Sequence, residues 1–359
     1  MKEIKCYGCG AIIQTNSPKE PGYLPEKAFN NERVLCQRCF KLMHYHTKIE
    51  TSAESIDFVK ILSQIGQKDA LVIYIVDLFD LYGSMIPGFM RHVGFNDVLV
   101  LANKRDVLPK SLKDDKLERY VRRQLKKESI KPLDVIITSA KKNYNYDLIY
   151  ESINELRKGR DVYVTGTTNV GKSSFINGLL KHYGGIKGFI TVSEFPGTTL
   201  GMIKIPLDEN SAIYDTPGII NNHQMTSRVT NKDLVKVIPQ SEIRPVTFQL
   251  SENQTLYFGA LARLDYSGDK GSFTCYFSKN LPIHRTKLEN ADNLYNRHME
   301  LKIGIDISKI EDFETISYTV KEPCEIVISG LGFISVNALG TIKIHVPAGI
   351  DVIMRERMI

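Results

Sequence analysis

The chain has no stretch approaching eighteen uninterrupted apolar residues, no low-complexity tract, and no apolar segment at its start, which reads M-K-E-I-K-C. The first absence argues against a membrane-spanning helix, and the last argues against a secretory signal. A cytosolic location is therefore expected. The excess of basic residues is also small, because a net charge of +6 permits a polyanionic partner without requiring one.

Cysteine is scarce and unevenly placed. The six cysteines are Cys6, Cys9, Cys36, Cys39, Cys275 and Cys324. The first four form two C-x-x-C pairs with a 26-residue spacer, which is typical of a structural tetrahedral Zn²⁺ site in a reducing compartment. A redox role for C-x-x-C fits a βαβ setting, which is absent here. We expect the last two cysteines to be core residues, and His44 and His46 to be surface or partner-contacting groups.

Three regions differ in pattern and predict three domains. Residues 1–54 hold the paired cysteines but too few apolar residues for a core, so a zinc-knuckle domain there would take its folding free energy from the metal. Residues 55–230 alternate strand-like runs with helical stretches, which is typical of an α/β domain with a parallel sheet. Residues 231–359 carry period-two runs punctuated by glycine, which predict a β-rich, antiparallel domain. A role of this domain in RNA or protein interaction is a separate expectation that these runs do not supply.

The predicted elements can be stated by range. The parallel strands are 71–76, 97–102, 134–138, 161–165 and 212–214. The strands of the tail are 325–329, 333–336 and 341–346. The helices are 113–127, 146–157, 174–180 and, in the tail, a stretch near 287–301.

Residues 166–173 read G-T-T-N-V-G-K-S and match the phosphate loop G-x-x-x-x-G-K-[ST] between a predicted strand and a predicted helix. Backbone N–H groups and the helix N-terminus would surround phosphate oxygens. Lys172 would reach the β- and γ-phosphates, and the Ser173 hydroxyl would ligate Mg²⁺. The predicted nucleotide contacts of this loop are Gly166, Thr167, Thr168, Asn169, Val170, Gly171, Lys172, Ser173 and Ser174.

Residues 103–106 read N-K-R-D, the pattern N-K-x-D with which translation-factor-type GTPases read guanine. The motif follows an apolar run directly, at the carboxyl end of a predicted strand, where α/β sheets bind ligands. Asp106 would accept two hydrogen bonds from guanine, Lys104 would lie along the base plane, and Asn103 would tie the loop together and reach N7. Taken alone, the motif could also be a charged loop. A second base contact is predicted at Ser139, Ala140 and Lys141, where the Ala140 N–H would meet guanine O6.

Two motifs downstream of the phosphate loop predict the γ-phosphate contacts. Asp215-Thr216-Pro217-Gly218 is a D-x-x-G motif at the end of a strand, so Asp215 would hold Mg²⁺ through water and the Gly218 N–H would meet the γ-phosphate. P-G-T-T at 196–199 supplies a switch threonine. By resemblance to GTPases that carry P-G-T-T, we choose Thr199 over Thr198 as the residue that closes on Mg²⁺ when GTP is bound.

The order of these motifs is permuted, because N-K-x-D and S-A-K precede the phosphate loop, whereas ordinary GTPases place them last. Strand order in the sheet can survive if the old ends are joined and a new break opens in an exposed connection. Helix 146–157 leads straight into the phosphate-loop strand and provides that joint. The new break follows D-x-x-G, so we hypothesise that GTP hydrolysis repositions the domain from about 231 onward.

The residue after Gly218 is Ile219, which cannot orient a water molecule as the glutamine of Ras-like enzymes does. Slow intrinsic turnover is therefore predicted. Asn169 resembles an asparagine that helps bind K⁺ in a subset of GTPases, where the cation offsets developing charge; alternatively, it only stabilises the loop turn. The predicted catalytic set is Lys172, Thr199, Gly218 and Asn169.

Helix 113–127 is rich in basic residues, which could form a nucleic-acid surface or a solvated face offset by nearby acids. The zinc segment adds further basic residues, and zinc ribbons often contact nucleic-acid backbones. The basic residues include Lys116, Arg119, Arg122, Arg123, Lys126 and Lys127 in the helix, and Arg33, Arg38, Lys41 and Lys48 in the zinc segment.

Zinc knuckles, N-K-R-D, S-A-K, the phosphate loop, P-G-T-T, D-T-P-G and a β-rich tail together resemble the YqeH family of permuted GTPases over essentially the whole chain. That resemblance implies a bacterial cytosolic GTPase in assembly of the small (30S) ribosomal subunit, with rRNA or a ribosomal protein as partner. A monomer is expected. Two other classes remain open: an RNA-modifying enzyme with a GTPase module, and a signalling switch that binds protein only. The first would need a second catalytic constellation, and no cluster of His, Cys or carboxylates is apparent in the tail.

Overall fold

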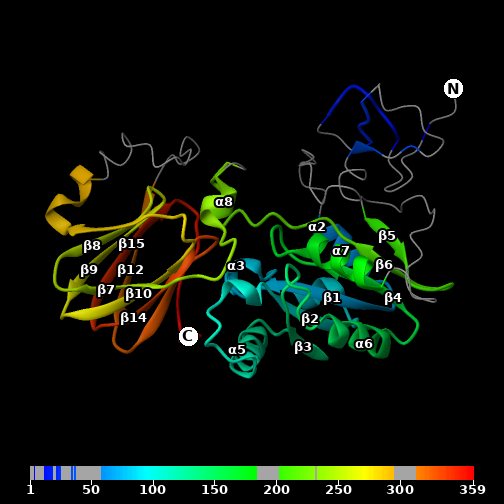
Figure 1. Cartoon of the computed structure of the whole chain (residues 1–359), viewed down its shortest axis with the longest axis horizontal. Coiled ribbons are helices and arrows are strands. Elements are labelled where there is room, and N and C mark those ends of the chain that lie inside the picture. The colour runs from blue at the N-terminus through cyan, green and yellow to red at the C-terminus, as the bar shows by residue number, and fades with distance from the viewer. Residues whose placement is uncertain are drawn as a thin grey trace. The chain divides into compact units, whose positions relative to one another are not determined.

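A computed structural model describes residues 4, 12–18, 22–25, 34, 36–37, 58–183, 202–230, 233–294 and 313–359. The chain divides into two compact units (Figure 1). Unit 1 takes in residues up to Asp77, then Met85–Arg105 and Val121–Ile219. Unit 2 takes in Leu78–Ser84, Asp106–Tyr120 and Ile220–Ile359.

Unit 1 contains a six-stranded sheet with the order β3-β2-β1-β4-β6-β5. Its strands are β1 (Ala70–Asp77), β2 (Asp97–Asn103), β3 (Asp134–Ile137), β4 (Asp161–Thr165), β5 (Ile203–Pro206) and β6 (Ala212–Asp215). All neighbours are parallel except β5 and β6, which are antiparallel. Every residue of β1 is buried, as an apolar strand covered on both faces requires. The predicted parallel sheet is confirmed, and the edge strand β5 is an addition to it.

Helices cover this sheet on its two faces. On one face, α6 (Tyr146–Arg157) and α7 (Lys172–Tyr183) share an apolar core with the strands, to which Ile149, Ile153 and Phe175 contribute. Unit 1 also contains α2 (Phe58–Ile65), α4 (Phe89–Val93) and the second half of α5 (Asp114–Lys127). The Phe89 ring stacks on Tyr74 of β1 at 4.0 Å between centroids. Helix α6 begins and ends where the sequence predicts.

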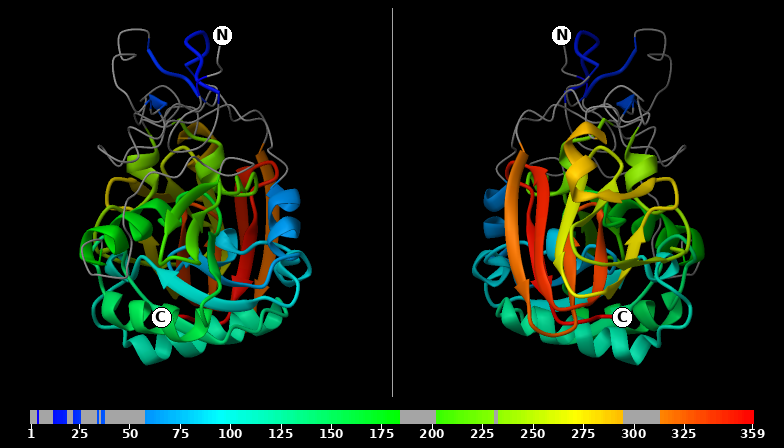
Figure 2. Two further views of the ribbon diagram at one scale, coloured as in Figure 1. Left: turned by 90° about the vertical axis from the view of Figure 1, so that its right-hand side faces the viewer. Right: turned by 90° about the vertical axis from the view of Figure 1, so that its left-hand side faces the viewer.

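Unit 2 is built on two five-stranded antiparallel sheets, with the orders β16-β13-β14-β10-β7 and β11-β8-β9-β15-β12 (Figure 2). One buried apolar cluster draws on both sheets and includes Leu256 and Ile344 from one and Phe273 and Ile334 from the other. The strands are β7 (Val246–Leu250), β8 (Gln254–Phe258), β9 (Ala262–Gly268), β10 (Gly271–Phe277), β11 (Ile283–Lys287), β12 (Phe313–Val320), β13 (Cys324–Ile328), β14 (Gly332–Asn337), β15 (Gly340–Pro347) and β16 (Val352–Arg355). The predicted β-rich tail is confirmed.

Two segments from within the predicted 55–230 domain belong to unit 2 instead. Segment 78–84 contains α3 (Leu81–Ser84), and segment 106–120 contains the start of α5 (Asp114–Lys127). The Arg355 guanidinium of β16 lies over the rings of Tyr82, Tyr120 and Phe333 at 5.8, 5.5 and 5.1 Å. Arg355 also pairs with Glu325 at 2.8 Å, and both side chains are at most 1% exposed. These contacts explain why unit 2 includes segments whose sequence resembles a GTPase domain.

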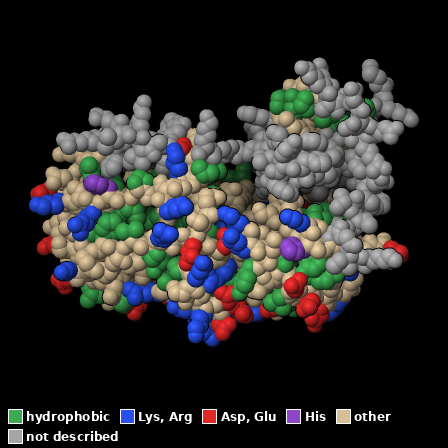
Figure 3. Space-filling view, in the orientation of Figure 1, with side chains coloured by type: hydrophobic (Ala, Val, Ile, Leu, Met, Phe, Trp, Pro, Cys, Tyr) green, Lys and Arg blue, Asp and Glu red, His purple; other side chains and the backbone are tan. Residues whose placement is uncertain are grey.

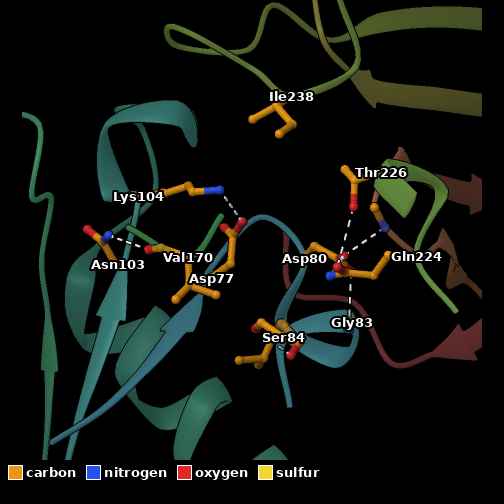
Figure 4. Close-up of polar contacts among 12 residues, drawn as sticks. Asp77, Asp80, Gly83, Ser84, Asn103, Lys104, Val170, Gln224, Thr226 and Ile238 are labelled. Atoms are coloured by element: carbon orange, nitrogen blue, oxygen red, sulfur yellow. Dashed lines mark hydrogen bonds and ion pairs between the residues drawn. The ribbon is translucent and has the colours of Figure 1, made fainter. Parts of the chain in front are cut away.

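The chain after D-x-x-G also belongs to unit 2, whose last segment begins at Ile220, ahead of the predicted boundary near 230. Asp80 accepts a hydrogen bond from the Gln224 side chain (2.9 Å) (Figure 4). It accepts another from the Gly330 N–H (2.7 Å). The Met225 N–H donates to the Ser329 carbonyl at 2.7 Å. Short helices follow, η4 (Met225–Ser227) and α8 (Leu234–Val237).

Several smaller predictions can be compared with the fold. Cys275 and Cys324 are buried in unit 2, and burial raises the pKa of both thiols, as expected of core residues. The predicted helix near 287–301 begins with η5 (Leu288–Asn290) and continues to residue 294, where the described stretch ends. Over the described ranges, no helix is long and apolar enough to cross a membrane.

Candidate nucleotide site

The predicted nucleotide motifs lie at the carboxyl ends of the parallel strands of unit 1. The strand register places Asp77 of β1 level with Asn103 of β2, and Val164 of β4 level with Asp215 of β6. Ligands bind at this edge of open α/β sheets. Motifs that are permuted along the chain are therefore brought together by strand order.

The phosphate loop connects β4 to α7. Lys172 is 2% exposed, and its ammonium donates to the carbonyls of Gly166 (2.7 Å) and Thr167 (2.9 Å). The lysine therefore crosses the inside of the loop, where a bound phosphate would lie. Helix α7 has no acidic residue in its first turn, so no carboxylate opposes an anion at its N-terminus.

Asn103 joins the phosphate loop to the base-side loops. Its side-chain amide donates to the Val170 carbonyl at 2.6 Å (Figure 4). The amide oxygen accepts a hydrogen bond from the Ala140 N–H at 2.8 Å. Gly171 has φ 97°, and a Cβ there would lie 2.4 Å from the Asn103 amide nitrogen. Glycine is thus required for both conformation and space. The predicted tying role of Asn103 fits this geometry, whereas the Ala140 N–H, assigned to guanine O6, donates to Asn103 here.

The D-x-x-G segment contacts the phosphate loop through its backbone. The Thr168 N–H donates to the Ile219 carbonyl at 2.6 Å, and the Ile219 N–H donates to the Gly166 carbonyl at 3.3 Å. A Cβ at Gly218 would lie 2.9 Å from the Lys172 ammonium. The residues expected to sense the γ-phosphate therefore lie directly on the loop that would bind it.

The side chains at this edge also fit a magnesium ion. The Ser173 hydroxyl is buried and has no hydrogen-bond partner among the residues that the structure describes. Asp215, the second predicted ligand, ends the neighbouring strand β6. Hydroxyl and carboxylate oxygens next to phosphates are the ligands that Mg²⁺ prefers. Ser173 and Asp215 would hold the ion, and its charge would offset that of the phosphates.

The guanine motif occupies the end of β2 and the short helix η2 (Arg105–Val107). Lys104 has φ 69°, and its ammonium lies 2.5 Å from an Asp77 carboxylate oxygen. Asp106 is half-buried in η2. Asp77 was not singled out from the sequence, because its place beside N-K-x-D depends on the pairing of β1 with β2.

Some predicted site residues lie outside the described residues or receive only partial support. Thr199 of the switch and the zinc candidates Cys6, Cys9 and Cys39 are outside them, whereas Cys36 is buried. In the part that the structure describes, no group of three or more His, Cys, Asp or Glu side chains could hold a metal ion. Asn169 is exposed with φ 63°, a conformation that asparagine tolerates.

A phosphate loop on a parallel sheet, with the guanine motif on a strand that precedes it in the chain, defines a circularly permuted P-loop GTPase. Residues 161–256 match the family model described as 50S ribosome-binding GTPase, and residues 270–358 match YqeH-like, C-terminal. The protein is a GTP hydrolase, and it belongs to the YqeH family. It is 46% identical over 366 residues to the YqeH protein of Bacillus subtilis (strain 168), and 100% of each chain is covered.

More distant similarities extend beyond bacteria. A rice protein named putative nitric oxide synthase is 27% identical over 98% of this chain and 76% of its own length. A protein of Arabidopsis thaliana named NO-associated protein 1 is 28% identical, over 93% of this chain and 70% of its own. The GNP-bound structure of YlqF from T. maritima is 23% identical with a TM-score of 0.30, covering 46% of this chain and 57% of that one. That overlap is too partial to carry an inference.

Proposed function

We propose that this GTPase is a nucleotide-dependent switch in assembly of the small (30S) ribosomal subunit, acting in the cytoplasm with rRNA or a ribosomal protein as partner. Full-length similarity to Bacillus subtilis YqeH supports a ribosomal role through the family resemblance. The family model over residues 161–256 is described by its binding to the 50S subunit. The test must therefore compare the two subunits.

The observation that carries the switch is the position of Ile219. Its backbone pairs with Gly166 and Thr168 of the phosphate loop, and the next residue, Ile220, begins the last and longest segment of unit 2. No linker separates the γ-phosphate motif from the second unit. A change at Gly218 on hydrolysis would therefore act directly on a chain segment that Asp80 and Ser329 hold.

Helix α5 offers a surface for RNA. Its side chains Lys116, Arg119, Arg123 and Lys126 are exposed at helical spacing, and Figure 3 shows Lys and Arg side chains, interspersed with Asp and Glu, where Figure 1 draws this helix. Such a stripe suits a phosphate backbone. Arg122 pairs with Asp134 at 2.5 Å and contributes less to it.

Two metal ions complete the proposal. Cys6, Cys9, Cys36 and Cys39 would bind Zn²⁺ and fold the N-terminal segment. Metal analysis of the purified chain should give about one zinc per chain by the four-ligand rule, and Cys36→Ser with Cys39→Ser should release it.

Asn169 would help bind K⁺ beside the phosphates, with Lys172, Thr199 and Gly218 completing the hydrolytic set.

Co-sedimentation with purified 30S and 50S subunits tests the ribosomal role. With a GTP analogue, the full chain should pellet with 30S, and with GDP much less. Pelleting with 50S alone would transfer the proposal to the large subunit, and pelleting with neither would favour a signalling or RNA-modifying role.

A matched pair of variants tests the helix surface in the same assay. Lys116→Glu with Arg119→Glu should weaken binding to 30S by about tenfold at low salt, since each phosphate contact contributes through counterion release. Lys131→Glu with Lys158→Glu makes the same charge change at exposed positions outside α5 and should not. Equal losses in both pairs would mean that only net charge matters.

A further inference from the structure

Asp77 lies at the last position of β1 and belongs to none of the nucleotide motifs. The strand register pairs it with Asn103, the first residue of N-K-x-D. Lys104 then turns back with φ 69° and brings its ammonium to 2.5 Å from the Asp77 carboxylate (Figure 4). The side chains are 18% and 9% exposed, so this pair is shielded from water.

We infer that Asp77 is a positioning residue for guanine, because it fixes Lys104 before the nucleotide binds. A free lysine side chain has considerable rotamer entropy to lose when it is held in one conformation. An ion pair at its far end removes part of that cost in advance and leaves the aliphatic stem stretched across the end of the sheet. The inference depends on the assignment of residues 103–106 as the guanine motif.

The same pair could serve only to stabilise the edge of β1 and β2, and the two roles predict different results. If the pair only stabilises the sheet, its loss lowers the free energy of unfolding and leaves the dissociation constants of the nucleotides unchanged. If the pair positions Lys104, its loss raises the dissociation constants for GDP and GTP by the same factor, because both nucleotides carry guanine. The loss then appears in KM rather than in kcat.

A double-mutant cycle on the full chain separates these roles. Asp77→Asn, Lys104→Met and the double variant are titrated with a fluorescent GDP and a fluorescent GTP analogue, and each is unfolded in urea. Asp77→Asn should weaken both nucleotides by about tenfold, and the double variant should bind no more weakly than Lys104→Met alone. Asp77→Glu should recover part of the affinity.

The control is Asp97→Asn, which breaks a comparable ion pair with Arg160 (2.6 Å) at the amino end of β2. It should leave the affinity for GDP unchanged. Wild-type affinity in Asp77→Asn, or additive losses in the double variant, would overturn the inference while leaving the guanine motif in place. If Lys104→Met also binds GDP normally, the assignment of the motif is wrong as well.

Discussion

Replacing Asn103 with alanine removes the side chain that joins the phosphate loop to the base-side loops. Asn103 is 2% exposed, and its two hydrogen bonds to Val170 and Ala140 are 2.6 and 2.8 Å long. Both partners are buried, so alanine leaves a carbonyl and an N–H without a partner. Each buried group left unpaired costs about 1–3 kcal/mol. The free energy of unfolding should therefore fall by about 2–5 kcal/mol.

The same change should weaken GDP binding by about tenfold or more, because the nucleotide would bind only when both loops are in place. Urea titration of the nucleotide-free chain measures the first effect, and titration with a fluorescent GDP measures the second. The control is Asn96→Ala. Asn96 makes three side-chain hydrogen bonds, to Ala70, Ile65 and Val93, beside the amino end of β2, so its loss should cost similar stability without weakening GDP binding.

If both variants lose similar stability and bind GDP equally well, Asn103 has only a structural role. If Asn103→Ala loses less than about 1 kcal/mol, the hydrogen-bond reasoning itself is wrong.

Three further predictions concern other parts of the molecule. Arg355→Met should lower the free energy of unfolding by about 3–5 kcal/mol, because it leaves Glu325 charged and buried. Adding Glu325→Met to the same chain should restore most of that loss. Equal urea midpoints for the wild type and Arg355→Met would contradict this. The pKa of Asp265 is held at about 2, because hydrogen bonds from His345, Arg263 and Thr255 outweigh the burial that raises it. The ionised Asp265 therefore contributes to folding stability in full above about pH 4, and this contribution is lost as the pH falls toward 2. Urea unfolding across this range should show the free energy of unfolding falling by about 2 kcal/mol, and Asp265→Asn should abolish that fall. GTP hydrolysis should be faster in KCl than in NaCl, and Asn169→Gly, which keeps the positive φ, should remove the difference; an unchanged ratio would leave Asn169 as a turn residue.

Much of unit 1 could be predicted because its signals are local. Buried parallel strands are continuous apolar runs, so β1 and β4 stand out, and α6 shows its apolar period clearly. The phosphate loop can be recognised from its own motif and from the strand and helix patterns on either side of it. The edge strand β5 lacks such a run, because it is only four residues long and Lys204 and Pro206 interrupt its apolar residues.

What the sequence could not supply depends on contacts between distant residues. The role of Asp77 depends on strand register, which places it beside Asn103, 26 positions later. The assignment of segments 78–84 and 106–120 to unit 2 depends on Arg355 and Asp80, whose partners lie far away in the chain. No local pattern carries that information.

The chain leaves unit 1 for unit 2 three times, each time within or next to residues of the predicted nucleotide site. It leaves unit 1 after Asp77, the partner of Lys104; again at Arg105–Asp106, inside N-K-x-D; and again after Ile219, beside D-x-x-G. Binding of guanine should therefore act on unit 2 through the first two passages, and the γ-phosphate through the third. Hydrogen exchange can separate them: GDP added to the nucleotide-free chain should protect 78–84 and 106–120, whereas replacing GDP with a GTP analogue should change protection mainly at 216–224. If a single nucleotide change alters protection from exchange at all three segments together, guanine binding and γ-phosphate binding act on unit 2 by one route. The permuted motif order would then not separate base sensing from phosphate sensing.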